Sequence, residues 1–198
     1  MNEKQTCPPA VVSFFDYALF YVTDQGFQEE VEWCQNRDFS KITPLEFLNE
    51  YMFAVFSSSG LNYNVVRKSM DAFLKSFKDG ENAFETIKNH RMKDAITRMW
   101  VAYEQTFEML KSKSTDEDKI EYLATLRQIG KKEKYHLARN LGLNCVKPDR
   151  HMDRLAERWE FSTPLLMCQE IQKRRPEFRM GTIDVVLWRY CNLTGKVE

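Results

Sequence analysis

Residues 122–151 read YLATLRQIGKKEKYHLARNLGLNCVKPDRH, and this stretch decides the fold that the sequence predicts. Apolar residues at three- and four-residue spacings predict one helix over 116–127 and a second over 131–141, joined by a tight turn. Gly142 ends the second helix, and Asp149 falls at the first turn of the next one, seven residues later. A short turn that ends in glycine exposes backbone N–H groups where the helix dipole is positive, so a phosphate can bind there. The stretch therefore predicts a helical hairpin that grips a nucleic-acid backbone, followed by a carboxylate.

The charge of this region also favours a nucleic-acid partner. Between Arg127 and Arg158 there are nine basic and four acidic residues, a net charge of +5 in 32 residues. The whole chain has 29 basic and 29 acidic residues, so the remainder carries a net charge of −5. Binding depends on how charge is distributed over faces rather than on its sum. We therefore predict a basic patch within an otherwise acidic protein.

Length and composition bound the protein class. A chain of 198 residues suits one large domain or two small lobes that share a core. The longest apolar run, Val11 to Val22, is interrupted by Ser13 and Asp16, is shorter than the ~20 residues that cross a bilayer, and lacks the features of a signal peptide. We expect a soluble, intracellular protein of the cytoplasm that does not contact membranes. The five cysteines include no CxxC pair, so we expect neither a metal site nor a disulfide framework.

Helical periodicity extends through most of the chain, and no stretch predicts a sheet. Thr43-Pro44-Leu45-Glu46 is a capping box that should begin a helix, and Gly60, Gly80 and Gly142 stand where a left-handed residue would end one. The polar stretch 111–118, KSKSTDED, is the best candidate for a solvent loop between two lobes. The predicted helices cover 9–22, 25–36, 44–58, 62–78, 81–89, 91–111, 116–127, 131–141, 149–158, 164–174 and 181–191.

The hairpin residues resemble a known family, the helix-hairpin-helix DNA glycosylases, which include endonuclease III and the 3-methyladenine glycosylases. In that family a Leu-Pro-Gly-Val-Gly hairpin is followed by a helix, a glycine and Val-Asp-x-His. Leu126-Arg-Gln-Ile-Gly130 is similar to the hairpin, with Arg127 and Gln128 in place of the proline and the first glycine, and Asp149-Arg150-His151 is similar to Asp-x-His. Weaker similarity extends the resemblance to about residues 43–191, through 53–60, 64–68, 87–96 and 184–190.

The resemblance implies an all-α fold of two lobes, with DNA bound in the cleft between them. The segment 1–40 would be an N-terminal accessory layer, 41–198 the glycosylase domain, and 116–158 its hairpin lobe. The partner would be double-stranded DNA with one nucleotide flipped out, bound by a monomer. No cofactor is implied, although a structural monovalent cation at the hairpin would be compatible with the resemblance.

The resemblance assigns catalysis to Asp149. Cleavage of an N-glycosidic bond passes through an oxocarbenium-like sugar, which a carboxylate stabilises while it orients or deprotonates the attacking water. Family members that also cut the strand form a Schiff base with a lysine of the hairpin's second helix. Counting from Gly130 selects Lys132, whereas counting from Asp149 selects Lys131. Because the spacing is one residue shorter than in the lyases, we favour a glycosylase without lyase activity.

Further implied roles concern DNA binding and the flipped base. Phosphates that flank the extruded nucleotide need basic side chains and backbone N–H groups, and the flipped base needs aromatic faces and polar groups. The DNA-binding residues would be Gly130, Lys134, Lys147, Arg150, His151 and Arg154. The base pocket would be formed by Ser57, Asn62, Tyr63 and Trp100, with Trp188 as a further wall.

Simpler interpretations stay open for each of these residues. Asp149 would cap the following helix even without a catalytic role. His151 is more simply a hydrogen-bonded structural histidine, and the hairpin lysines can form a solvated helix face. Trp100 repeats at helical spacing with Tyr103 and Phe107, which is typical of core packing.

These patterns together predict a DNA N-glycosylase, a hydrolase that flips out and removes a damaged or modified base. Small residues at 57–60 leave room for a bulky base, so removal of a phage-type hypermodified base in antiviral defence stands beside DNA repair. The alternatives are a non-catalytic helix-hairpin-helix DNA-binding module and an α-helical protein-interaction domain. Release of free base distinguishes the enzyme from the module, because both bind DNA in a salt-sensitive manner.

Overall fold

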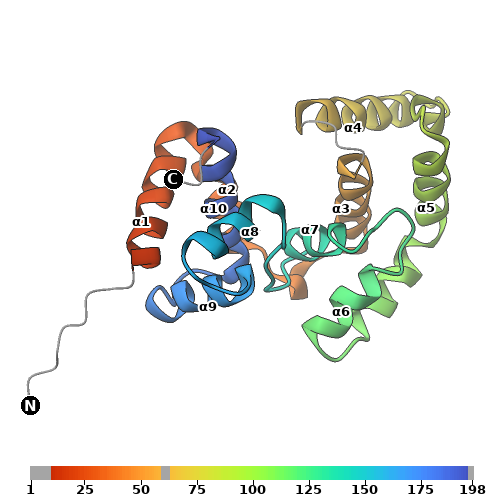
Figure 1. The fold of residues 1–198 in the computed structure, drawn as a ribbon. Helices are drawn as coiled ribbons and strands as arrows, with labels where there is room; N and C mark the ends of the chain where they lie inside the picture. The colour runs from red at the N-terminus through yellow and green to blue at the C-terminus, as the bar shows by residue number, and fades with distance from the viewer. Residues whose placement is uncertain (1–9, 59–62, 196–198) are drawn as a thin grey trace, which may run out of the picture. The chain divides into compact units, whose positions relative to one another are not determined.

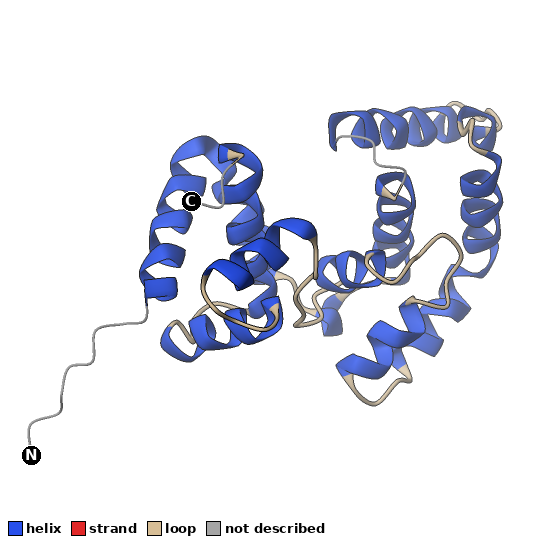
Figure 2. Ribbon diagram, in the orientation of Figure 1, coloured by secondary structure: helices blue, strands red, loops and turns tan. Residues whose placement is uncertain are grey.

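The structure is a computed structural model that describes residues 10–58 and 63–195, with side chains from residue 65 in the second range. Within these residues the fold consists of ten α-helices and short helical turns, without a strand (Figures 1 and 2). The predicted all-α class is therefore confirmed. The helices are α1 (Ala10–Val22), α2 (Gln28–Asn36), α3 (Pro44–Ser57), α4 (Tyr63–Lys78), α5 (His90–Lys111), α6 (Asp116–Leu123), α7 (Glu133–Asn140), α8 (Arg150–Arg158), α9 (Pro164–Arg174) and α10 (Met180–Thr194).

Local sequence explains where several helices begin and end. The capping box at α3 forms as predicted: Thr43 Oγ1 accepts the Glu46 N–H at 3.2 Å, and the Glu46 carboxylate accepts the Thr43 N–H at 2.9 Å. Gly80 and Gly142 adopt φ angles of 75° and 86° just after α4 and α7, also as predicted. Gly60 lies outside the described residues.

One predicted helix is wrong. Residues 81–89 form only a 3-10 turn, Ala83–Thr86, rather than a helix. Asn89 is instead the N-cap of α5. Its side-chain oxygen accepts the N–H groups of Arg91 at 3.0 Å and Met92 at 3.3 Å. Burial of Ala83 and Ile87 holds the intervening segment against the core in a non-helical path.

The chain divides into two compact units, Asp38–Leu141 and the combination of Met1–Arg37 with Gly142–Glu198. This division differs from the domains predicted from the sequence. The N-terminal helices are not a separate layer, because they share a core with the C-terminal part of the chain. The boundary at Leu141 also divides the predicted hairpin lobe, 116–158, so that its hairpin and its aspartate belong to different units.

The unit that contains both chain ends is built around α10. This helix contacts α1, α2, α8 and α9, and most of its residues are buried. Phe15 of α1 is fully buried and packs edge-on against Phe178 with ring centroids 5.3 Å apart. Two ion pairs connect distant segments of the unit: Arg175 binds Asp16, and Arg189 binds Glu30 at 2.6 Å.

The other unit is built around α3, which contacts α4, α5 and α7. Phe47 of α3 stacks on Phe107 of α5, with ring centroids 5.5 Å apart. Asn140 at the end of α7 donates to the Glu50 carboxylate of α3 at 2.9 Å. Helices α6 and α7 pack on each other and form a helical hairpin at one end of this unit (Figure 1).

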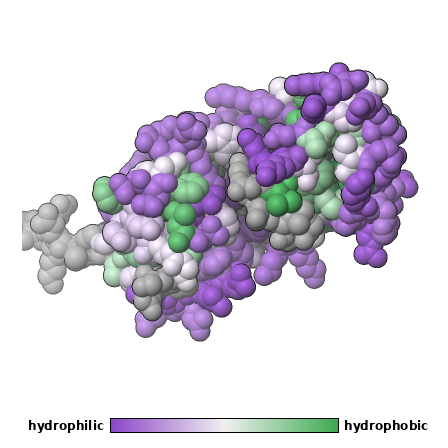
Figure 3. All heavy atoms as spheres, turned by 90° about the horizontal axis from the view of Figure 1, so that it is seen from above, coloured by the Kyte–Doolittle hydropathy of each residue, from purple (hydrophilic) through white to green (hydrophobic). Residues whose placement is uncertain are grey.

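Polar residues dominate the face of the molecule that Figure 3 shows. Hydrophilic residues cover most of the face drawn in Figure 3, and hydrophobic residues appear there only in small patches. The most exposed large apolar side chains are Val101, at 84%, and Phe20, at 69%. Within the described residues, no helix combines the length and apolar character needed to span a membrane.

Replacement of Phe15 by alanine tests whether α1 belongs to the core of its unit. Because the ring is fully buried, Phe15→Ala should lower the free energy of unfolding by about 3–5 kcal/mol. Phe20→Ala is the matched control on the same helix, and it should change the free energy by less than about 0.5 kcal/mol since that ring is exposed. Urea denaturation measures both, and equal effects of the two substitutions would contradict the packing described above.

Candidate nucleic-acid interface and catalytic carboxylate

The predicted hairpin forms from α6, a turn over residues 124–132, and α7. Thr115 begins α6 by accepting the Asp118 N–H at 3.0 Å. Leu123, Ile129 and Leu137 are buried and attach both helices and the turn to the core of their unit. The first helix is shorter than predicted, because it ends at Leu123 rather than at residue 127.

The left-handed position of the turn is Gln128 rather than a glycine. Gln128 has a φ of 63°, whereas Gly130 does not have a positive φ. Gln128 is the residue that stands where the resembled motif has its first glycine. The turn therefore adopts at this position the backbone conformation that glycine favours, although the side chain is large.

Several backbone N–H groups of the turn lack partners. The first backbone bonds of the second helix are Lys134 N–H to Gly130 C=O at 3.0 Å and Tyr135 N–H to Lys132 C=O at 3.3 Å. Within the described part of the chain, the N–H groups of Gly130, Lys131 and Lys132 have no hydrogen-bond acceptor, and no side chain caps α7. All three residues are exposed. Amides without acceptors at the start of a helix, with two exposed lysines beside them, would offer an anion both the positive end of a dipole and positive charge.

Lys134 does not have the role that the sequence assigned to it. Its residue is only 8% exposed, its ammonium group binds the Glu121 carboxylate of α6 at 2.5 Å, and it lies 5.0 Å from the centre of the Tyr135 ring. The side chain therefore connects the two helices of the hairpin instead of extending to a phosphate. Helical spacing alone could not distinguish this inward-facing lysine from its exposed neighbours.

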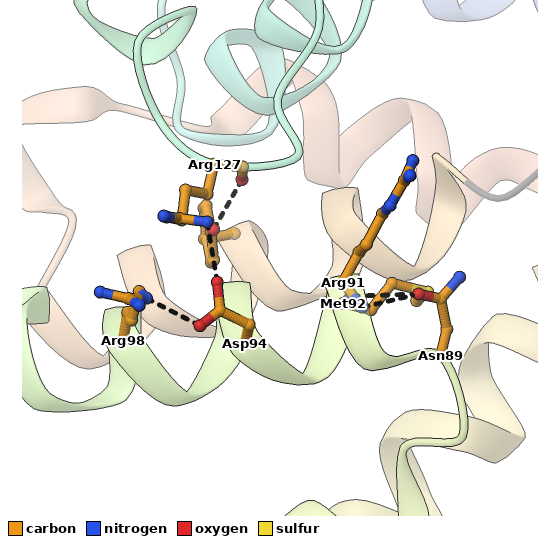
Figure 4. Close-up of polar contacts among 7 residues, drawn as sticks. Asn89, Arg91, Met92, Asp94, Arg98 and Arg127 are labelled. Carbon is orange, nitrogen blue, oxygen red and sulfur yellow. Dashed lines mark hydrogen bonds and ion pairs between the residues drawn. The ribbon is translucent and has the colours of Figure 1, made fainter.

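A polar network holds the turn against α3 and α5 (Figure 4). The Tyr51 hydroxyl donates to the Arg127 carbonyl oxygen at 2.7 Å, and the Arg127 guanidinium binds Asp94 at 2.8 Å. Arg98 binds the other oxygen of Asp94, also at 2.8 Å. The hydrogen bond from Arg98, together with the charges of both arginines, lowers the pKa of Asp94, while burial raises the pKa of Tyr51 well above its usual value. Sequence reasoning missed this network, since only the pair Asp94–Arg98 has a recognisable helical spacing.

Asp149 lies in the other unit, at the start of α8. One of its carboxylate oxygens, Oδ1, accepts the N–H groups of His151 at 2.9 Å and Met152 at 3.1 Å. The simpler interpretation of Asp149 as an N-cap is therefore confirmed. The second oxygen, Oδ2, has no hydrogen bond to any described residue, and the side chain is half-buried. The carboxylate is thus oriented by one oxygen and available at the other.

The last helix lies close to this carboxylate. Burial raises the pKa of the Cys191 thiol of α10 to about 11, and the negative charge of Asp149 adds to this rise. Asp184, also on α10 and 1% exposed, accepts the backbone N–H of Lys147 at 3.3 Å. This contact holds the segment that leads into Asp149 against the core of its unit.

The basic residues predicted beside Asp149 lie on or before α8. Arg150 and Arg154 are exposed, one turn apart, and neither has an ion pair among the described residues. Lys147 and His151 are half-buried. Met152, Leu155 and Ala156 form the opposite, buried face of the helix. The exposed side of α8 therefore carries these arginines together with the acidic residues Asp153 and Glu157, and it adjoins the carboxylate in the same unit.

The described residues include only part of the predicted base pocket, which therefore stays a prediction. Ser57 is the half-buried last residue of α3, Asn62 lies outside the described residues, and the side chain of Tyr63 is not among those described. Trp100 packs against aromatic rings at the junction of α4 and α5, which favours the core-packing interpretation; these rings belong to Phe73, Phe77 and Phe84. Trp188 belongs to the other unit and lies 4.8 Å below the Arg189 guanidinium.

Two surface hollows are present elsewhere. One of about 500 Å³ lies between α1 and α2 and includes Phe20 and Glu32, and one of about 580 Å³ lies beside the hairpin and includes Lys113 and Tyr122. Neither contains a residue predicted for the base pocket.

Among the described residues, no three metal-ligating side chains form a group, and four cysteines are buried thiols.

Comparison with protein-family models, with curated proteins and with solved structures gives no match for this chain.

Glycine at position 128 tests the conformation of the turn. A left-handed backbone costs a non-glycine residue roughly 1–2 kcal/mol, so Gln128→Gly should raise the free energy of unfolding by about 1 kcal/mol. Gln128→Ala is the control, because it removes the same side chain and keeps the backbone cost. Urea denaturation of both variants checks the sign, and a destabilising glycine would show that residue 128 is not left-handed.

Proposed function

We propose that this protein is a DNA N-glycosylase of the helix-hairpin-helix type that removes a damaged or modified base. The observation that carries the proposal is the Asp149 carboxylate, which is oriented through Oδ1 and has no hydrogen bond at Oδ2 within the described residues, at the start of a helix that exposes Arg150 and Arg154. The helical hairpin with unpaired amides precedes it in the chain, in the order that the resembled family has. The following paragraphs give the support for each step.

The hairpin turn has the properties of a phosphate-binding element. Gly130, Lys131 and Lys132 are three consecutive exposed residues whose N–H groups lack acceptors in the described part of the chain, and two of them carry lysine side chains. A DNA strand supplies regularly spaced phosphates, and their neutralisation releases counterions, so the binding would weaken as salt rises. The turn would position the strand without reading its sequence.

Asp149 has the geometry that the chemistry requires. As the glycosidic bond breaks, positive charge develops on the sugar, and a nearby carboxylate oxygen stabilises it or accepts a proton from the attacking water. The two backbone N–H donors keep the carboxylate in place, so little reorganisation is needed at the moment of reaction. Arg150 and Arg154 would bind the phosphates on either side of the flipped nucleotide.

A glycosylase without lyase activity is favoured. Lys131 and Lys132 both lie in the turn before α7, which begins at Glu133, whereas the Schiff-base lysine of the resembled lyases is on the helix itself. Lys134, the first lysine on the helix, is occupied by its ion pair with Glu121. No lysine of the hairpin therefore combines the helical position and the exposure of a Schiff-base nucleophile.

The proposed substrate is a damaged or modified base in DNA. It is either a lesion removed in DNA repair or a phage-type hypermodified base removed in antiviral defence. A panel of duplexes with alkylated, oxidised and hypermodified bases, next to unmodified DNA, would reveal the class by mass detection of the released base. Accumulation of abasic sites in any of them separates the enzyme from a non-catalytic DNA-binding module.

Asparagine at position 149 tests the catalytic carboxylate. Asparagine caps helices as well as aspartate does, so Asp149→Asn should change the free energy of unfolding by less than about 0.5 kcal/mol and should still bind DNA. Release of base from the active duplex should fall by at least about 1000-fold, because the neutral amide neither stabilises the cation nor accepts a proton. Asp149→Ala, which also loses the cap, should lose about 1 kcal/mol of stability in addition. Base release by the asparagine variant at the wild-type rate would end the assignment.

Alanine at position 130 tests whether a phosphate approaches the turn. A methyl group at Gly130 would meet no protein atom within 4 Å, so Gly130→Ala should fold with unchanged stability. A phosphate bound at the neighbouring amides would contact this methyl group, so the affinity for a DNA duplex should fall about tenfold. Fluorescence anisotropy measures the affinity, with Thr125→Ala on the other side of the turn as the control. Unchanged affinity in the Gly130 variant would place the DNA elsewhere.

A further inference from the structure

The turn of the hairpin has one strong attachment to the rest of its unit. The Tyr51 side chain is buried, with 1% of the residue exposed, and its hydroxyl bonds to the Arg127 carbonyl at 2.7 Å. Tyr51 lies in the middle of α3, the helix that α4, α5 and α7 contact. The donor side of this hydrogen bond is buried while Arg127 itself is exposed, so the bond connects the main chain of the turn to the interior of the unit.

The Arg127 side chain gives the same residue a second attachment. Its guanidinium binds Asp94 of α5, and Arg98 holds the other oxygen of that carboxylate (Figure 4). These side chains are partly exposed, at 61% for Arg127 and 41% for Asp94, so solvent and salt weaken this pair. The buried tyrosine is thus the stronger of the two attachments and the arginine pair the weaker.

We propose that Tyr51 and Asp94 are positioning residues that fix Arg127 and thereby set the backbone of the anion-binding turn. This inference rests on the proposed function and deepens it, because it names what holds the DNA-binding amides in place. Neither residue touches DNA in this proposal. Both act through Arg127, the residue directly before the left-handed position.

The backbone explains how the effect reaches the amides. Gln128 follows Arg127 and has a φ of 63°, a conformation that costs a non-glycine residue roughly 1–2 kcal/mol and needs support from its surroundings. Ile129 follows, 5% exposed, with its N–H bonded to the Leu126 carbonyl at 3.1 Å. Gly130 is next, so the anchored residue lies only three positions before the first exposed amide. Release of Arg127 would let the turn relax and move the amides apart.

The test compares two Tyr→Phe variants of the full chain. Tyr51→Phe removes only the buried hydroxyl, and Tyr103→Phe is the matched control on α5, where the hydroxyl bonds to the neighbouring Glu104 side chain. The amide signals of Gly130, Lys131 and Lys132 in ¹⁵N–¹H spectra should shift in the first variant and stay unchanged in the second. Asp94→Asn should shift the same signals at low salt and less at high salt.

DNA binding supplies the functional measurement, with a short duplex that carries a single stable abasic-site analogue as the probe. Tyr51→Phe should raise the dissociation constant about five- to tenfold, the effect of one hydrogen bond, with one binding site per molecule retained. If Tyr51→Phe only reduced the fraction of folded protein, fewer molecules would bind and the dissociation constant would stay unchanged. This outcome would overturn the proposal. Unshifted amide signals in Tyr51→Phe would overturn it as well. If the wild-type protein itself fails to bind the duplex, the proposed function fails, and the amide signals still decide whether Tyr51 positions the turn.

Discussion

A single buried hydroxyl supports the turn on which the candidate interface depends. The Arg127 carbonyl lies in a segment with few backbone partners of its own, and the Tyr51 phenol supplies the donor that it needs. Because this tyrosine belongs to the central helix of its unit, the turn shares the rigidity of the core. Gln128 can then keep a left-handed conformation that an isolated chain would avoid. The turn is held to the interior by this hydrogen bond together with the buried side chain of Ile129.

The candidate catalytic carboxylate, which belongs to the other unit, depends on a different constraint, the N–H groups at the start of a helix that lack intrahelical acceptors. Asp149 satisfies two of them with one oxygen, and this contact also immobilises the carboxylate. Helix capping and catalysis are therefore compatible roles for this residue, because each uses a different oxygen. Asp184 adds to the order of the segment by holding the backbone of Lys147 from α10. Asp149 is explained by its role as an N-cap, and the same geometry also suits the proposed catalytic role.

Much of the fold could be predicted because its signals are local. Thr43 with Glu46, and Gly142 after α7, mark helix ends through contacts with residues a few positions away. The failure at 81–89 has the opposite cause, since burial of Ala83 and Ile87 outweighs the helical preference of that segment. Lys134 is a similar case: its charge suggested a phosphate partner, but the packing of α7 against α6 turns it inward to Glu121.

The sequence by itself determined the class of the fold, most helix boundaries, the hairpin and the position of Asp149 at a helix start. These features depend on side-chain periodicity and on hydrogen bonds between residues close in the chain. Only the tertiary structure decided that α1 and α2 share a core with α8 to α10, that Trp100 packs among phenylalanines, and that Tyr51 and Asp94 hold Arg127. Those outcomes depend on contacts between residues 33 to more than 70 positions apart in the hairpin network, and on which faces are buried together. Spacing along a chain does not encode such contacts, because they arise only when helices pack.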